Sequence, residues 1–118
     1  MYEVRVLSRF SSAHNLRNYK GKCENLHGHT WKVELCLAGE KLNSDGFLCD
    51  FVELKKELNI LLDRYDHKYI NEVTPFDKLN PTAENLARVI YDELKQKFSG
   101  LLEVTVWESD DARAVYKA

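Results

Sequence analysis

Histidines have the most suggestive spacing in this chain. His27 and His29 are separated by one glycine in a segment that is expected to be a β-strand. Residues two apart on a strand point to the same face, so both imidazoles can reach one metal ion. His14 lies near the end of another expected strand. Three imidazoles that leave a fourth position open are typical of a catalytic zinc site, which is the site that this pattern predicts.

A cysteine beside these histidines allows two kinds of zinc site. Cys23 precedes His27 by four residues, close enough to act beside the metal. A thiol must lose its proton to act as a base, and a nearby metal favours that loss. As a fourth ligand, Cys23 would instead close the coordination sphere and make a structural site. Structural sites usually contain more thiolates, which favours the open site.

Two amphipathic strands are expected to carry the histidines. Apolar and charged residues alternate over residues 2–13, and His14 continues the apolar parity of Phe10. The second strand is expected over residues 27–38, with His29 in phase with its apolar side. Such alternation is typical of a half-buried strand, so all three imidazoles should point toward the core.

Two helices are expected in the middle of the chain. Asp50 and Glu53 have the form of a capping box that starts the first helix, which should end near residues 64–65. Asn80 or Thr82 should cap the second helix, and Gly100 should end it. The expected buried stripes are Phe51, Leu54, Leu58, Leu61 and Leu62, then Leu86, Ile90, Leu94 and Phe98.

Two more strands should follow, over residues 102–107 and 112–117, with Leu102, Val104 and Val106 on the apolar side of the first. Glu108 continues the apolar parity of the first of them, so its carboxylate is either at an exposed strand end or buried with a partner, for example Arg113 across the turn. The order ββααββ predicts an α+β fold, with two helices on one face of an antiparallel sheet. The length of 118 residues predicts one domain over residues 1–118.

Net charge and cysteine content indicate which partners and which cellular compartment to expect. The formal net charge is −2, so no general attraction to nucleic acid or to acidic membranes is expected. There are three cysteines without a CxxC pair, which predicts free thiols and a reducing, cytoplasmic setting. The sequence shows no signal peptide and no apolar run of membrane-spanning length.

One competing motif is rejected. Gly21-x5-His27-x-His29-x4-Glu34 resembles the first metal-binding signature of cupins. In a regular strand, however, Glu34 lies on the opposite face from His29 and cannot share its metal. Two strong helices also do not suit an all-β jelly roll.

Five segments in this order resemble the 6-pyruvoyltetrahydropterin synthase / 6-carboxytetrahydropterin synthase family, over nearly the whole chain. They are Phe10–His14, Cys23-x3-His27-Gly28-His29, Leu62–Lys68, Asn80–Ala87 and Val106–Glu108. The resemblance implies a tunnelling fold (T-fold), whose subunits join their sheets into a β-barrel, commonly as trimers stacked into hexamers. It also implies that His14, His27 and His29 bind zinc and that Cys23 is the thiolate that abstracts a proton. Asp66 and His67, contributed by a neighbouring subunit, would be the partners of Cys23. Glu108 and Thr82 would hold a pterin ring.

The implied substrate is 7,8-dihydroneopterin triphosphate. The compact chain and the Cys23 motif most resemble the branch that makes 6-carboxytetrahydropterin, with release of acetaldehyde and triphosphate, on the route to queuosine. Glu24 favours an alternative reaction, in which the side chain of the pterin substrate is cleaved to give a 6-hydroxymethyl pterin for folate. This reaction would be the only activity or a second activity beside the first. Elimination to 6-pyruvoyltetrahydropterin is a further alternative, and a non-catalytic zinc module used for assembly is an alternative of a different class.

Simpler interpretations stay open for several of these residues. Asp66-His67 can be a polar helix exit, and Thr82 can serve as a helix cap alone. The basic loop residues Arg17, Lys20 and Lys22 either contact the triphosphate or form a solvated loop.

Overall fold

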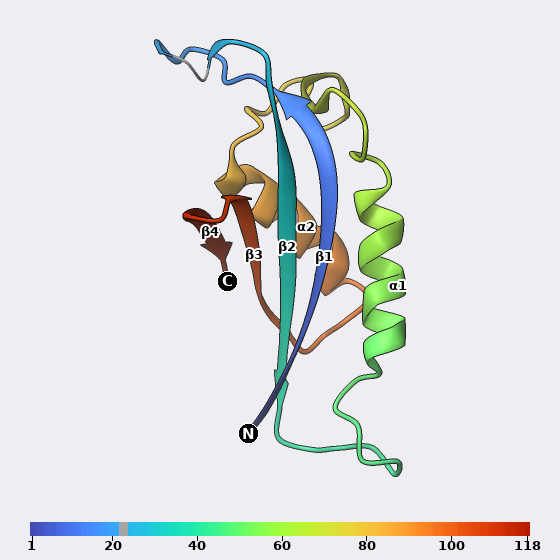
Figure 1. Cartoon of the computed structure of the whole chain (residues 1–118). Helices are drawn as coiled ribbons and strands as arrows, with labels where there is room; N and C mark the ends of the chain where they lie inside the picture. Colours follow the sequence, from blue (N-terminus) through green and yellow to red (C-terminus); the bar gives the residue numbers. More distant parts are fainter. Residues whose placement is uncertain (22–23) are drawn as a thin grey trace.

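The computed structural model describes residues 1–21 and 24–118, and it folds them into a four-stranded antiparallel sheet with two α-helices (Figure 1). The elements are β1 (Tyr2–His14), β2 (His27–Gly39), α1 (Phe51–Leu62), the short 3-10 helix η2 (Ile70–Glu72), α2 (Ala83–Lys95), β3 (Leu101–Ser109) and β4 (Ala112–Tyr116). This order confirms the α+β fold that the sequence predicts. The prediction for Cys23 falls outside the described residues.

Strand register brings the histidines to one end of the sheet. The strands follow the order β1-β2-β3-β4, and β1 pairs with β2 along its whole length. His14 lies opposite His27, and Ser12 lies opposite His29. Directly opposed residues in an antiparallel pair point to the same face, so the three imidazoles share one face of the sheet.

The core lies between that face and the two helices. Trp31, Val33 and Leu35 of β2 are fully buried, as are Leu54 and Leu58 of α1. Leu86, Ala87 and Ile90 contribute the facing side of α2. In Figure 1 neither helix covers the face of the sheet that is turned toward the viewer. The sheet therefore has one packed face and one open face.

Both helices begin at side-chain caps. Asp50 caps α1 by accepting a hydrogen bond of 2.9 Å from the backbone N–H of Val52, not of Glu53, so the expected capping-box bond does not form. Thr82 caps α2 by accepting a 3.1 Å bond from the N–H of Asn85. Thr82 is thus the cap, and Asn80 is not.

Three details of the sequence interpretation are wrong. Phe51 is 56% exposed, because the apolar pattern of α1 begins one turn before Leu54, the first residue of the helix that packs on the core. Helix α2 ends at Lys95, so Gly100 is not its cap, although Phe98 is buried in the following turn. Leu102 is 40% exposed and Leu101 is buried, because Leu102 is the extra residue where the β2–β3 register shifts.

The molecule is elongated. Its principal extents are 52 × 25 × 22 Å and its radius of gyration is 15.1 Å. A compact domain of this length would have a radius of gyration of about 13.5 Å. No helix among the described residues has the length and apolar character needed to cross a membrane.

The difference between Phe51 and Leu54 is testable by stability. Leu54→Ala should lower the free energy of unfolding by about 2–5 kcal/mol, because it leaves a cavity in the core. Phe51→Ala, in the same helix, should cost less than about 1 kcal/mol, because the ring is mostly exposed already. Denaturant unfolding followed by helix circular dichroism measures both, and equal losses would contradict this packing.

Candidate metal centre

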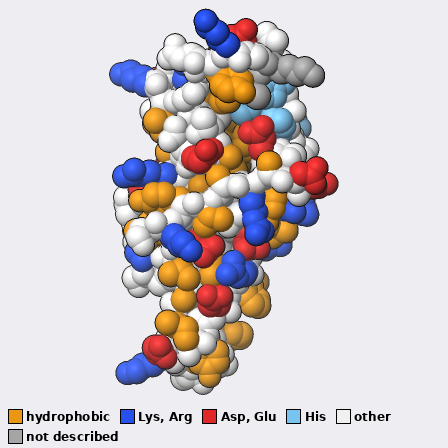
Figure 2. Space-filling view, turned by 90° about the vertical axis from the view of Figure 1, so that its left-hand side faces the viewer, with side chains coloured by type: hydrophobic (Ala, Val, Ile, Leu, Met, Phe, Trp, Pro, Cys, Tyr) orange, Lys and Arg blue, Asp and Glu red, His pale blue; other side chains and the backbone are white. Residues whose placement is uncertain are grey.

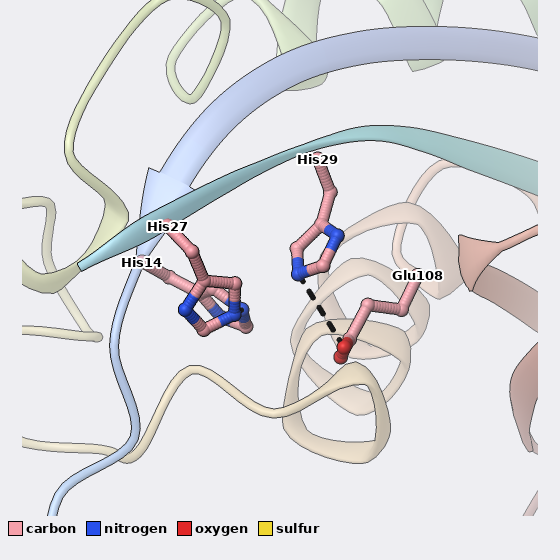
Figure 3. A group of neighbouring side chains, drawn as sticks. All are labelled: His14, His27, His29 and Glu108. Atoms are coloured by element: carbon pink, nitrogen blue, oxygen red, sulfur yellow. Dashed lines mark hydrogen bonds and ion pairs between the residues drawn. The ribbon is translucent and has the colours of Figure 1, made fainter. Parts of the chain in front are cut away.

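Three imidazoles and one carboxylate converge at the end of the sheet (Figure 3). His14 comes from the end of β1, His27 and His29 from the start of β2, and Glu108 from β3. One ligand atom from each lies within 4.8 Å of the others. Figure 2 shows histidine side chains at the surface near one end of the molecule, with an acidic side chain beside them. The structure therefore brings together the three histidines that the sequence predicts as ligands.

Glu108 joins the cluster because it lies on the inner face of β3, the parity of the buried Val104 and Val106. Its Oε1 is 3.4 Å from Nε2 of His29. The alternative partner, Arg113, instead places its guanidinium 5.4 Å from the centroid of the Trp107 ring. The alternation of apolar and polar residues along the strand predicts that Glu108 points inward, but it does not predict contact with His29.

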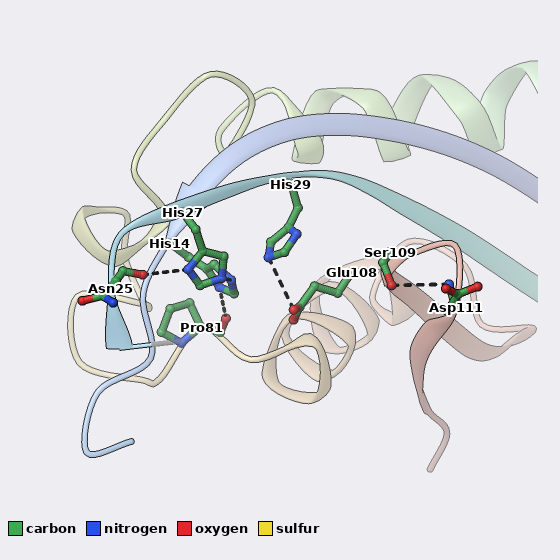
Figure 4. A network of polar contacts seen from close by, with 8 residues as sticks. All are labelled: His14, Asn25, His27, His29, Pro81, Glu108, Ser109 and Asp111. Carbon is green, nitrogen blue, oxygen red and sulfur yellow. Dashed lines mark hydrogen bonds and ion pairs between the residues drawn. The ribbon is translucent and has the colours of Figure 1, made fainter. Parts of the chain in front are cut away.

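Backbone carbonyls set the proton positions on two of the rings (Figure 4). Nδ1 of His14 lies 2.8 Å from the carbonyl oxygen of Pro81, and Nδ1 of His27 lies 2.7 Å from that of Asn25. A carbonyl only accepts hydrogen bonds, so each Nδ1 must carry the hydrogen and donate it. In the neutral ring each Nε2 is then left with a free lone pair.

These lone pairs face each other. Nε2 of His14 and Nε2 of His27 are 2.9 Å apart. Nε2 of His29 is buried and makes no hydrogen bond. Facing lone pairs repel unless a cation lies between them, and three imidazole nitrogens, two of them on rings whose second nitrogen bonds a carbonyl, are a donor set that zinc prefers. The residues therefore fit a zinc ion, for which His14, His27 and His29 would be the ligands.

Burial keeps these rings ready to bind a metal. Desolvation lowers the pKa of His14 below its ordinary value, although the Pro81 carbonyl works in the opposite direction. Desolvation also lowers the pKa of His29, against the attraction of the Glu108 carboxylate. Since the neutral imidazole is the form that binds metal, both shifts favour metal binding over protonation.

A side-chain amide fixes the chain immediately after His14. Asn71, which is buried, accepts a 3.0 Å bond from the N–H of Asn15 and donates a 2.9 Å bond to the carbonyl of the same residue. Tyr69 donates its hydroxyl hydrogen to the Asn15 side chain. This clamp was not foreseen from the sequence, because nothing in the pattern of residues 69–71 shows which backbone they meet.

Arg17 continues the clamp. Its guanidinium donates hydrogen bonds to the carbonyls of Asn71, Phe76 and Leu79, at 3.1, 2.7 and 3.1 Å. Its own N–H donates to the side chain of Asn80 at 2.9 Å. The donors of Arg17 are thus used inside the chain, which argues against a role as a triphosphate contact. Lys20 is exposed, and Lys22 lies outside the described residues.

Asp66 and His67 lie together but not at the metal cluster. Oδ2 of Asp66 is 3.0 Å from Nδ1 of His67. Their segment runs along the edge of β1: Oδ1 of Asp66 accepts a 2.9 Å bond from the N–H of Ser11, and the N–H of His67 donates to the Ser11 carbonyl at 2.6 Å. The Ser11 N–H and then His67 hold the pKa of Asp66 below its ordinary value.

His67 lies at the edge of β1, near the end of the sheet. It lines a shallow depression of about 600 Å³ together with Ser11, His29, Thr30 and Lys68. The hydroxyls of Ser11 and Thr30 are 3.2 Å apart, and strand alternation puts both on the face opposite to the three ligand histidines. His67 is 81% exposed. Within one chain, Asp66 and His67 therefore do not meet the metal cluster.

The remaining predicted residues have these positions. Glu24 is exposed, and its N–H donates to the Gly21 carbonyl at 3.2 Å. Thr82 is confirmed as a helix cap, adjacent to the Pro81 carbonyl that binds His14. A role of Cys23 beside the metal stays a prediction, because that residue lies outside the described part of the chain.

Comparison with known proteins identifies the family. The family model described as 6-pyruvoyl tetrahydropterin synthase matches residues 3–118. The chain belongs to this family. It is 32% identical to 6-carboxy-5,6,7,8-tetrahydropterin synthase of Bacillus subtilis, over 98% of this chain and 85% of the relative. It is 30% identical to dihydroneopterin monophosphate aldolase of Pyrococcus furiosus, over 92% of this chain and 93% of the relative.

Among solved structures, the chain is similar to Caenorhabditis elegans 6-pyruvoyl tetrahydropterin synthase. The TM-score is 0.91 at 31% sequence identity, over 99% of this chain and 95% of that chain. The four-stranded sheet with two helices is thus the T-fold of this family.

The ligand set can be tested by zinc affinity. His29→Ala should weaken zinc binding more than about 100-fold, since losing even an outer-shell partner typically costs 10–100-fold. Glu108→Gln should weaken it less than about tenfold, because three imidazoles suffice and Glu108 is not required as a ligand. Competition with a chromophoric chelator at pH 7 measures both values. A loss in Glu108→Gln as large as that in His29→Ala would make the carboxylate a ligand.

Proposed function

We propose that this protein is a zinc-dependent lyase that converts 7,8-dihydroneopterin triphosphate to 6-carboxytetrahydropterin, with release of acetaldehyde and triphosphate, for queuosine or another deazapurine. The observation that carries the proposal is the convergence of three imidazole nitrogens, from His14, His27 and His29. Such a site suits catalysis because three protein ligands leave a fourth position for a substrate atom. The similarity to a 6-carboxy-5,6,7,8-tetrahydropterin synthase supports the choice of product.

Zinc at this site would polarise the hydroxyl oxygens of the substrate side chain and lower their pKa. The residues of the chain hold the rings for that purpose. The Pro81 and Asn25 carbonyls orient His14 and His27, and the Asn71 clamp fixes the chain just after His14. Preorganised ligands of this kind need no rearrangement when the substrate binds.

Glu108 is the proposed anchor of the pterin ring. It lines a depression of about 430 Å³ with Ala83 and Arg113, beside the start of α2 and adjacent to the metal cluster. A carboxylate can accept two hydrogen bonds, one from the ring N–H and one from the amino group of a pterin. Thr82, at the same helix start, is the proposed second contact to the ring.

Cys23 is the proposed base, with Asp66 and His67 supplied by a neighbouring copy. The position of Asp66 and His67 along the edge of β1 supports this, since neither belongs to the metal cluster of their own chain. Sharing a site in this way requires an assembly. We therefore infer a homo-oligomer, a trimer or a hexamer, in which the sheets join into a β-barrel.

The shape of the chain supports this assembly. The molecule is elongated, one face of the sheet carries no helix, and β1 is a long edge strand of 13 residues. Long edge strands expose unpaired backbone groups unless another chain covers them. A barrel formed by several copies would pair such edges. Residues 1–118 would act as one domain in it, with a single core between sheet and helices.

The compartment we propose is the cytoplasm. Cys36 and Cys49 are free thiols among the described residues, as expected in a reducing environment. The partners would then be the small pterin substrate and further copies of the same chain.

One second activity has specific support. Glu24 follows Cys23 directly, and a carboxylate there could remove a hydroxyl proton of the substrate. The relative from Pyrococcus furiosus, named an aldolase, is similar over nearly the whole chain. Side-chain cleavage to a 6-hydroxymethyl dihydropterin is therefore the second candidate, either alone or beside the first.

The proposal is tested by incubating the zinc-loaded protein with 7,8-dihydroneopterin triphosphate and identifying the products by mass spectrometry. We expect 6-carboxytetrahydropterin and acetaldehyde. A 6-hydroxymethyl pterin as the main product would favour the Glu24 activity. Absence of any product from a zinc-loaded, folded protein would contradict the enzyme and favour a zinc module used for assembly.

Cys23→Ala is the matching control variant. It should keep its zinc, because Cys23 is not a ligand in this account, and it should lose carboxypterin formation by at least about 100-fold, because the base is gone. Full activity in this variant would remove Cys23 from the mechanism. Loss of the zinc would make the thiol a ligand.

A further inference from the structure

A row of residues on the open face of the sheet contains three cations, two of which contact one indole ring. The strand register places Arg9 opposite Lys32, Lys32 opposite Trp107, and Trp107 opposite Arg113. All four side chains therefore share one face, opposite to the core and the metal cluster. Nζ of Lys32 lies 4.6 Å, and Cζ of Arg113 lies 5.4 Å, from the centroid of the Trp107 ring.

These cations have no acidic partner within the described residues. No carboxylate there lies within 4.0 Å of Arg9, Lys32 or Arg113. In contrast, Arg5 on the same face pairs with Glu34 at 2.8 Å and with Glu3 at 3.3 Å. The chain as a whole has a net charge of −2, so the row is a local excess of positive charge. Like charges this close favour an external anion between them.

Polar groups extend the row toward the end of the sheet. The Ser11 and Thr30 hydroxyls form the next row on the same face, 3.2 Å from each other. They line the depression of about 600 Å³ that also contains Lys68 and His67. Hydroxyl and cationic donors around an open depression suit the oxygen atoms of a phosphate group.

The size of the positive region limits the ligand. The row crosses four strands, which corresponds to about 14 Å at the usual strand spacing. On its other side the next row contains Glu34, whose carboxylate ends the positive region. Within one chain these limits suit a short chain of phosphates, whereas a long polyanion such as a nucleic acid duplex needs a more extended surface. The guanidinium groups of Arg9 and Arg113 also match phosphate oxygens in geometry.

We propose that Arg9, Lys32 and Arg113 form an anion site for short polyphosphates, separate from the metal centre. Trp107 positions two of the cations by cation–π contact. The polyphosphate has two possible sources, free inorganic triphosphate or the triphosphate tail of a substrate bound at a neighbouring copy. The second source rests on the proposed function, whereas the site itself rests on the charges and the register.

The test uses the zinc-loaded full chain and inorganic triphosphate as the probe. The double variant Arg9→Gln/Lys32→Gln should weaken triphosphate binding at least tenfold in isothermal titration, with unchanged zinc content and circular dichroism. The matched control Lys55→Gln/Arg88→Gln removes two exposed charges from α1 and α2 and should change the affinity less than twofold. Lys32→Gln alone serves as a second variant if the double variant folds poorly, and it should show at least a threefold loss.

Equal triphosphate affinity in the wild type, the double variant and the control would overturn the site. So would an equal loss of affinity in the double variant and the control, because it would show only an effect of net charge. A second arm uses 7,8-dihydroneopterin triphosphate. A KM raised tenfold at unchanged kcat in the double variant assigns the site to the substrate tail, and an unchanged KM assigns it to free triphosphate. If wild type shows no turnover but the variant still loses triphosphate binding, the proposed function fails and the anion site stands.

Discussion

The metal centre depends most on two hydrogen bonds from imidazoles to backbone carbonyls. Pro81 accepts from Nδ1 of His14, and Asn25 accepts from Nδ1 of His27, which leaves two Nε2 lone pairs facing each other at 2.9 Å. Such an arrangement is unfavourable without a positive charge between the nitrogens. The metal-binding character of the site is thus a consequence of where the backbone of two loops lies, and not only of having three histidines.

The rest of the fold holds those carbonyls in place. The β1–β2 register opposes His14 to His27, and the Thr82 cap fixes the start of α2 directly after Pro81. Arg17 and Asn71 tie the loop after β1 to the segment between η2 and α2. A small domain with one packed face thereby obtains a rigid site at the end of its sheet, while the other face of the sheet is left open.

Sequence reasoning could predict the parts that depend on period. Alternation in the strands showed that His14, His27 and His29 share the face of the core, and the helix stripes gave the correct order of elements. It could not predict the parts that depend on tertiary contacts. The proton position on His14 follows from the Pro81 carbonyl, which is 67 residues away in the sequence. The contact of Glu108 with His29 joins two different strands, and the inward turn of Leu101 follows from a bulge. The same limit applies to Asp66 and His67, because their spacing in the sequence does not show where they lie relative to the sheet.

The most direct test of the account is X-ray absorption at the zinc edge of the zinc-loaded protein. The account predicts three nitrogen ligands at about 2.0–2.1 Å and one oxygen, with no sulfur, since His14, His27 and His29 leave one position open. A sulfur ligand at about 2.3 Å, or fewer than three imidazole nitrogens, would contradict it.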